Sequence, residues 1–231
     1  MFTPARQRGT ETLDNPHADP ALALRSLRDV ALANRFFGGR RAVLRAVAPL
    51  LGPARATTSA LTLLDIGTGL GDIPAAAQAM ARRAGVVLHT IGLERVSPLA
   101  RAAQRQCAQA LAGDALALPF ADRSIDVVTC SQVLHHFDGA EAECLLQECT
   151  RVARQRVIIG DLRRSWLAAA GLWLSSWGLG FHPVSRHDGV VSVLRGYTPD
   201  ELRTLVARAT GITPAVHAGL GFRITAAWSP R

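Results

Sequence analysis

Lysine is absent from this chain of 231 residues, and all 26 of its basic side chains other than histidine are arginine. The formal net charge is +8, but a complete lack of lysine indicates a compositional bias, which weakens any inference from charge to a binding partner. The arginines are spread along the chain in runs of no more than two, so they form no concentrated nucleic-acid patch. We therefore interpret the charge as a solvated basic surface and do not expect nucleic acid as a partner.

Cysteine is also scarce, and its spacing fits neither a CxxC motif nor a nearby histidine pattern that would suit zinc. We expect reduced, mostly buried thiols and no metal site. The first 20 residues contain no apolar core and are not expected to act as a signal peptide. The most apolar run, residues 166–181, is interrupted by serine and glycine and is shorter than the ~20 residues that span a bilayer. The sequence thus favours a cytoplasmic protein with no transmembrane segment.

Apolar strands alternate with helical segments over most of the chain, which is long enough for one domain with a substantial core. We expect an N-terminal arm and two helices in residues 1–52, covering the substrate mouth, and the main domain in residues 53–231. Strands are expected at 60–66, 86–94, 111–113, 124–131, 156–162, 214–220 and 222–228. Helices are expected at 72–85, 97–111 and 139–153 and from Thr198, and an irregular lid insertion at about 163–197. This order predicts an α/β fold with a doubly wound, seven-stranded, mostly parallel sheet and an antiparallel pair at its end.

Three glycines follow the first expected strand at every second position, in the segment LLDIGTGLGD at residues 63–72. Glycine at such a turn lets a ligand approach the backbone closely. A dinucleotide fingerprint spaces its glycines G-x-G-x-x-G, and the third position here is Asp72 instead. Asp65, two residues before the first glycine, would repel a pyrophosphate and hold an ammonium group. The motif therefore predicts a cofactor with a cationic amino-acid end and an adenosine end, S-adenosylmethionine.

Two further carboxylates lie where the rest of such a cofactor would need them. Glu94 ends the second expected strand, the position from which an acidic residue binds ribose hydroxyls in related sheets. Asp114 follows the third strand and could accept a hydrogen bond from an adenine amino group. An exposed strand-end glutamate and a turn aspartate are the ordinary alternatives for these two residues.

These segments, together with GDALALPFADRSIDVVTCSQVLHHF at 113–137 and the terminal strand pair, resemble the class I S-adenosylmethionine-dependent methyltransferases. The likeness is to the branch that methylates ubiquinone precursors and natural-product phenols, and it covers residues 60–160. It implies a Rossmann-like methyltransferase fold and release of S-adenosylhomocysteine. It also implies that backbone and side chains around the loops hold the cofactor, at Asp65, Gly67, Thr68, Gly69, Gly71, Glu94, Arg95, Asp114, Ala115 and Ser131. Arg95 stands where smaller or apolar residues are more usual.

Methyl transfer to a phenol requires a group that removes a proton, and histidine has a suitable pKa. His135 and His136 follow the fourth strand, at the same sheet edge as the cofactor, and Asp161 ends the fifth strand beside them. In members of the branch that this chain resembles, a histidine of this stretch acts as base together with such an acid. We expect His135 to be the base, with His136 as the weaker candidate and His187 as a further one.

The lid segment carries the candidates for substrate binding. His182 and Arg186 could reach an acceptor, and Arg186 could recognise its carboxylate or carbonyl group. Trp173 lies in a tryptophan-rich stretch that would suit a lid over a flat apolar compound, although packing or a peripheral membrane contact would also account for it.

The sequence therefore predicts O-methylation of a small phenolic, quinone-like or polyketide acceptor in natural-product biosynthesis. An RNA methyltransferase and a cofactor-binding protein without catalysis are the alternatives. The oligomeric state does not follow from the sequence.

Overall fold

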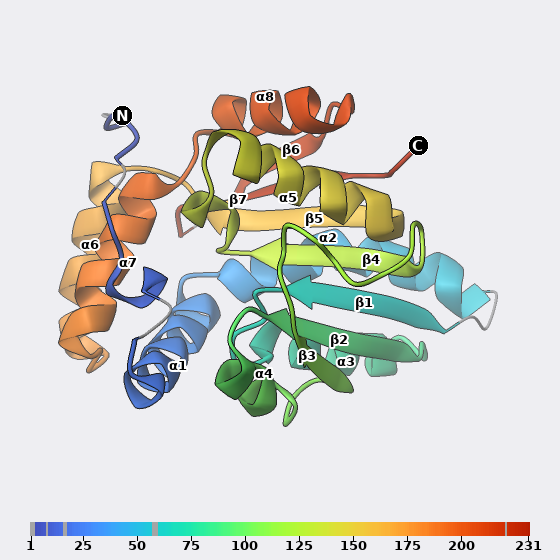
Figure 1. The fold of residues 1–231 in the computed structure, drawn as a ribbon, viewed down its shortest axis with the longest axis horizontal. Coiled ribbons are helices and arrows are strands. Elements are labelled where there is room, and N and C mark those ends of the chain that lie inside the picture. The colour runs from blue at the N-terminus through green and yellow to red at the C-terminus, as the bar shows by residue number, and fades with distance from the viewer. Residues whose placement is uncertain (1–2, 8, 16–17, 57–59, 220) are drawn as a thin grey trace.

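A single seven-stranded sheet forms the centre of the computed structural model, which describes residues 3–7, 9–15, 18–56, 60–219 and 221–231 (Figure 1). The strand order is β3-β2-β1-β4-β5-β7-β6. Strands β1 to β5 run parallel, and β7 is antiparallel to both of its neighbours. The strands are β1 (Leu61–Ile66), β2 (Leu88–Glu94), β3 (Gln109–Ala112), β4 (Ile125–Ser131), β5 (Ala153–Leu162), β6 (Ala215–Gly219) and β7 (Arg223–Trp228). This confirms the predicted mostly parallel sheet with a terminal antiparallel part, apart from Leu220, which lies outside the described residues.

Helices cover both faces of the sheet. The α-helices are α1 (Pro20–Phe36), α2 (Gly39–Ala56), α3 (Asp72–Arg83), α4 (Ser97–Ala103), α5 (Gly139–Val152), α6 (Trp166–Gly178), α7 (Pro183–Arg195) and α8 (Pro199–Thr210), and the 3₁₀ turns are η1 (Thr12–Asp14) and η2 (Leu134–His136). Helices α2 and α3 pack on one face, and α5 and α8 pack on the other. Successive residues Leu63 and Leu64 enter opposite cores, which explains why β1 is continuously apolar.

Several expected boundaries were wrong. The helix expected at 97–111 ends at Ala103, so β3 starts at Gln109, earlier than residue 111. Strand β5 begins at Ala153, three residues before the expected start. Helix α2 continues past residue 52 to Ala56 because its apolar side chains on both sides of Pro49 pack on the sheet.

Residues 163–197 are ordered as two helices, so the expectation of an irregular segment was wrong. Ser165 caps α6 by accepting a hydrogen bond from the backbone of Leu167, and Pro183 occupies the first turn of α7. The glycines and serines that suggested a loop are accommodated because α6 and α7 pack against each other. Of the helices in the described part of the chain, none is both long and apolar enough to cross a membrane.

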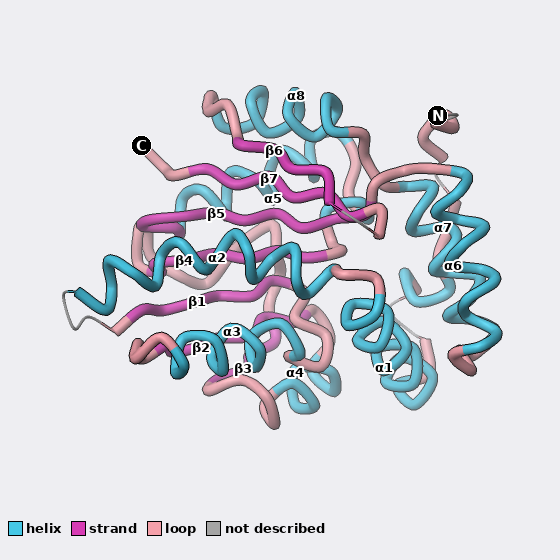
Figure 2. Tube along the Cα trace, turned by 180° about the vertical axis from the view of Figure 1, so that it is seen from behind, coloured by secondary structure: helices cyan, strands magenta, loops and turns pink. Residues whose placement is uncertain are grey.

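Helices α1, α6 and α7 lie together beyond the carboxyl ends of the parallel strands (Figures 1 and 2). The described part of the N-terminal arm runs along this group. Backbone and side chain of Thr12 both donate to Asp188 of α7, at 2.9 and 3.0 Å. Arg6 donates to the backbone oxygen of Arg195 at 2.7 Å. These contacts place the arm beside the sheet edge where the predicted site lies.

We expect Ile159→Ala in β5 to lower the free energy of unfolding by about 2–5 kcal/mol, because it leaves a cavity in the central core. Leu174→Ala, at a side chain of α6 that is mostly exposed, is the matched control and should cost less than about 0.5 kcal/mol. Urea denaturation measures both. Equal losses would show that the centre of the sheet is not the main source of stability.

Candidate active site

The register of the sheet brings the carboxyl ends of β2, β1, β4 and β5 to one edge. Ile66 pairs with Leu93 of β2 and Cys130 of β4, and Cys130 pairs in turn with Ile159 of β5. The residues just after these positions are therefore neighbours across the edge, in the arrangement in which doubly wound sheets bind their ligands. Most of the predicted site residues occupy these ends.

The glycine loop between β1 and α3 has a backbone conformation that residues with side chains rarely adopt. Gly67, Gly69 and Gly71 all have positive φ angles, of 63°, 59° and 78°. A Cβ atom on Gly67 would collide with the side chain of Val133, so the loop lies directly against the turn that carries the histidine pair. At Gly69 an added Cβ would lie 3.4 Å from the side chain of Leu27, in ordinary van der Waals contact, so α1 packs close to this part of the loop. This cradle fits a cofactor that approaches the backbone.

Asp65 is buried beneath the loop. Its two carboxylate oxygens accept hydrogen bonds from the hydroxyls of Thr68 and Thr129, at 2.9 and 2.7 Å. Burial raises the pKa of Asp65 to about 7, helped by the charges of Asp72 and Glu94 and opposed by the two hydroxyls. Asp65 therefore ties the loop to β4 and is poised to change its charge near neutral pH.

The other predicted cofactor residues surround the same loop. Glu94 accepts a hydrogen bond of 2.6 Å from the backbone of Gly69, and burial raises its pKa. The exposed Arg95 donates its backbone N–H to Glu94 at 3.2 Å. Asp114 is exposed and stabilises its own turn by accepting from the backbone of Leu116. Ala115 and Ser131 are partly buried.

His135 and Asp161 form a buried pair at the ends of β4 and β5. The imidazole Nδ1–H group donates to a carboxylate oxygen of Asp161 at 2.6 Å, and the backbone N–H of His135 donates to the other oxygen at 3.1 Å. Burial lowers the pKa of His135, but the charge of Asp161 and the nearby Glu11 outweigh it and raise the pKa to about 9. The paired histidine lowers the pKa of Asp161 against the effect of burial. The predicted association of these two residues is thus present.

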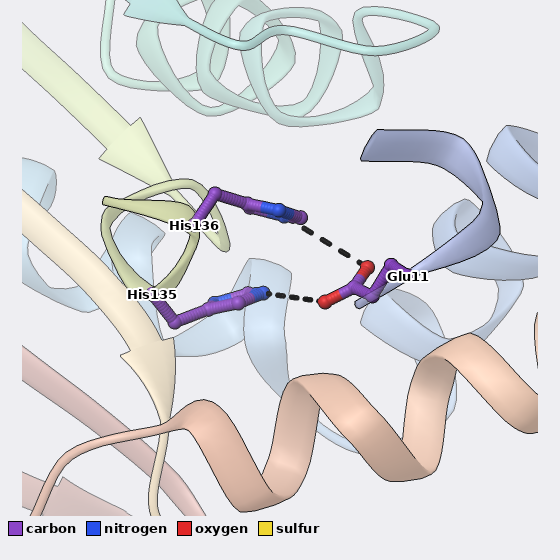
Figure 3. A group of neighbouring side chains, drawn as sticks. All are labelled: Glu11, His135 and His136. Atoms are coloured by element: carbon purple, nitrogen blue, oxygen red, sulfur yellow. Dashed lines mark ion pairs between the residues drawn. The ribbon is translucent and has the colours of Figure 1, made fainter. Parts of the chain in front are cut away.

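The N-terminal arm supplies two carboxylates that sequence reasoning missed. Glu11 lies beside the imidazoles of His135 and His136, with one carboxylate oxygen facing each ring (Figure 3), and Asp14 accepts a hydrogen bond from Nδ1 of His136 at 2.8 Å. Arg195 of α7 contacts both acids, at 3.4 and 2.7 Å. The segment TETLDN carries no motif, and only the pairing of Glu11 with Asp14 as a short capping box could have drawn attention to it. Glu11, His135 and His136 form a group with the donor atoms that a metal ion requires.

The remaining candidates lie apart from the histidine pair. His182 caps α7, and Arg186 stacks on Trp177 at 3.8 Å while donating to the backbone of Phe181. His187 is largely exposed and contacts Asp188 at 2.9 Å. About half of Trp173 is exposed on α6. The structure therefore does not bring these residues together with the buried pair.

The chain is similar to a known methyltransferase family in sequence and to known methyltransferases in fold. A family model described as "Methyltransferase domain" matches residues 64–159, a segment from within β1 to within β5 that contains the glycine loop, Glu94 and His135 and ends two residues before Asp161. No curated protein matches the chain in sequence. Residues 64–159 are thus similar to a methyltransferase domain, a family whose cofactor is S-adenosylmethionine.

Solved structures share the fold over most of the chain. A S-adenosylmethionine-dependent methyltransferase from Aquifex aeolicus is 15% identical, with a TM-score of 0.60 and coverage of 92% of this chain and 99% of its own. The magnesium protoporphyrin IX methyltransferase of Synechocystis, with bound S-adenosylhomocysteine, is 16% identical, with a TM-score of 0.54 and coverage of 84% of each chain. At this level of identity the likeness defines the Rossmann-like methyltransferase fold and leaves the acceptor open.

We expect Gly67→Ala to lower the free energy of unfolding by about 1–3 kcal/mol, because the new methyl group meets Val133 and the positive φ angle strains any other residue. Gly52→Ala in α2, where an added Cβ has no neighbour within 4 Å, is the control and should be neutral or stabilising. Thermal and urea unfolding measure the difference. Equal stability of the two variants would contradict the packing of the loop on Val133.

Proposed function

We propose that this chain transfers a methyl group from S-adenosylmethionine to an oxygen of a small acceptor, a phenolic, quinone-like or polyketide compound of natural-product biosynthesis. The observation that carries the proposal is the buried His135–Asp161 pair, next to the glycine loop, with Nε2 of His135 making no hydrogen bond within the described part of the chain. When bound, the cofactor supplies an electrophilic methyl group on a sulfonium. The protein has to hold the acceptor oxygen in line with that methyl and remove its proton.

The cofactor would lie along the edge formed by β1 and β2. Three glycines, Gly67, Gly69 and Gly71, keep side chains away from its methionine part, and Thr68 supports the loop through Asp65. The Glu94 carboxylate, whose pKa burial raises, would accept hydrogen bonds from two ribose hydroxyls. Asp114 and Ala115 would meet the adenine from the next loop, with Arg95 and Ser131 at the margins.

At the end of the site where the acceptor would bind, Asp161 holds the imidazole of His135 so that its Nε2 atom points away from the sheet core and toward Glu11. An acceptor hydroxyl reaches Nε2 only if the Glu11 carboxylate moves, because the two groups are 3.6 Å apart. Because Asp161 and Glu11 raise the pKa of His135 to about 9, the imidazole is protonated at neutral pH while Glu11 is in place, and it must first lose that proton. Departure of Glu11 removes one of the groups that raise this pKa; the proton of the acceptor would then pass to the neutral Nε2, and Asp161 would stabilise the resulting imidazolium. His136 and His187 are less suited to this role because their side chains are 31% and 63% exposed, whereas that of His135 is 2% exposed.

A cap over the acceptor follows from the same arrangement. The arm, α1, α6 and α7 gather beyond the strand ends, so that residues 1–52 and the insertion at 163–197 would enclose the acceptor. Within this lid, His182, Arg186 and Trp173 are bound to neighbouring lid residues, and they would contribute to acceptor binding by shaping the lid.

We expect cofactor affinity to fall as the pH decreases from 7.5 to 5.5. Asp65, with a pKa of about 7 in the free protein, must be ionised to hold the ammonium end, so each pH unit below 7 should weaken binding up to about tenfold. The ammonium has an ordinary pKa of about 7.7–8.0 and is about half deprotonated at pH 8, which sets the upper limit of the test. Calorimetry in buffers of different ionisation enthalpy measures both the affinity and the released proton. A pH-independent affinity, or one that Asp65→Asn leaves equally pH-dependent, would exclude this role.

His135→Gln should lower turnover by about 10²–10⁴-fold, the usual contribution of a general base, while cofactor affinity stays unchanged. Asp161→Asn should act in the same direction because it removes the charge that orients the imidazole. His187→Gln, on an exposed side chain, is the matched control and should retain activity. Transfer of labelled methyl groups to phenols, lipid quinones and tRNA measures the effect. Labelling of RNA alone, or full activity of His135→Gln, would contradict the proposal.

A further inference from the structure

Two imidazoles of the site are directed at one carboxylate of the N-terminal arm. Nε2 of His135 lies 3.6 Å from one oxygen of Glu11, and Nε2 of His136 lies 4.0 Å from the other oxygen (Figure 3). The two rings are tilted by 31° with centroids 4.3 Å apart, and the donor atoms of the three residues lie within 4.8 Å of one another. Three ligand atoms from two distant parts of the chain therefore face a common point.

These separations are too long for hydrogen bonds, which join nitrogen and oxygen atoms at about 2.7–3.2 Å. Atoms bound tetrahedrally at about 2.0–2.2 Å from zinc lie about 3.3–3.6 Å from each other. The His135–Glu11 separation of 3.6 Å is at the upper end of that range, and the His136–Glu11 separation of 4.0 Å is a few tenths of an ångström above it, so small shifts of the side chains would bring the three atoms to the spacing of metal ligands. His135 is only 2% exposed, and its Nε2 atom has no hydrogen-bond partner among the residues that the structure describes. A buried, unpartnered nitrogen aimed at a carboxylate is the second sign of a missing ligand.

Each histidine also has its Nδ1 atom hydrogen-bonded to a carboxylate, as metal-binding histidines usually do. Asp161 accepts a hydrogen bond from Nδ1 of His135 at 2.6 Å, and Asp14 accepts one from Nδ1 of His136 at 2.8 Å. A carboxylate on Nδ1 fixes the tautomer whose Nε2 lone pair is available, and it increases the basicity of that nitrogen. The same tautomer is thereby selected in both rings, with both lone pairs directed at Glu11.

The charges around the group favour a cation. Three carboxylates, those of Glu11, Asp14 and Asp161, contact the two imidazoles. Of the arginines, Arg195 contacts two of these acids, and the hydroxyl of Ser192 donates to Glu11 at 2.8 Å. The three acids outnumber the one arginine that contacts them among the described residues, so the group attracts positive charge, which either a proton on His135 or a divalent ion would supply.

We infer that Glu11, His135 and His136 bind one divalent transition-metal ion of the zinc type, with a fourth position open on the side of the partly exposed His136. Two imidazole nitrogens and one carboxylate suit zinc, whereas magnesium and calcium prefer oxygen ligands alone. The ion uses the Nε2 lone pair that would accept the acceptor's proton, and it ties the arm across the site. This consequence, inhibition of methyl transfer by the bound ion, rests on the proposed function, whereas binding itself does not.

Calorimetric titration of the chelator-treated, full-length protein with zinc chloride tests the site without any turnover. We expect one ion per chain, binding at least tenfold more weakly in Glu11→Gln and in His136→Gln. Asp14→Asn should lose about 10–100-fold although Asp14 touches no ion, because it removes the support of His136. His217→Gln, at an exposed histidine of β6, is the matched control and should bind normally. Affinity that Glu11→Gln and His136→Gln leave unchanged would show adventitious surface binding and overturn the inference.

Cobalt gives an independent readout of the ligand geometry. Cobalt(II) added to the chelator-treated protein should produce the intense visible absorption of a four-coordinate ion, and Glu11→Gln should abolish it while S-adenosylmethionine affinity stays the same. Absence of that spectrum in the parent protein would overturn the assignment of these ligands. In methyl-transfer assays, zinc should inhibit the parent protein and a chelator should restore activity. Zinc binding without inhibition would refute the inhibitory role, while a protein inactive under all conditions would refute the proposed function and leave the titration valid.

Discussion

The alignment of four parallel strand ends is the constraint on which the rest of the site depends. Because β2, β1, β4 and β5 end in register, the glycine loop, Glu94, the histidine turn and Asp161 become neighbours although they are far apart in the sequence. The contact between Gly67 and Val133 ties two of these ends together, and the Asp65–Thr129 hydrogen bond ties them a second time beneath the surface. In the proposed function, this arrangement places the methyl donor on one pair of strands beside the proton acceptor on the other pair.

The strands of the sheet, the residues at their ends and the glycine loop could be predicted from the sequence. Continuous apolar runs identify buried parallel strands, and residues at the ends of such strands share one edge, so the pairing of His135 with Asp161 followed from their positions alone. The spacing of the glycines indicated the class of cofactor, because backbone positions with positive φ favour glycine over other residues and so leave a pattern in the sequence. The terminal antiparallel pair followed from two short strands after the last helix.

The parts that depend on contacts between distant segments were not predictable. Residues 163–197 looked irregular because glycine and serine interrupt the apolar pattern, yet α6 and α7 become helical by packing against each other. Glu11 and Asp14 lie in a polar segment with no periodicity, and only the fold places them against the histidines. The side of the site proposed for the acceptor is thus assembled from the arm and residues 163–197, whereas the side proposed for the cofactor is built on the sheet. This division explains why the cofactor was easier to predict than the acceptor.

A structure of the full chain with S-adenosylhomocysteine would test the central claim most directly, because it locates the cofactor relative to the histidine pair. The account predicts the amino-acid part over residues 67–71, the ribose at Glu94, and the sulfur on the side of the glycine loop that faces His135. A cofactor bound at another edge of the sheet, or one whose sulfur is separated from His135 by the β4 turn, would contradict it.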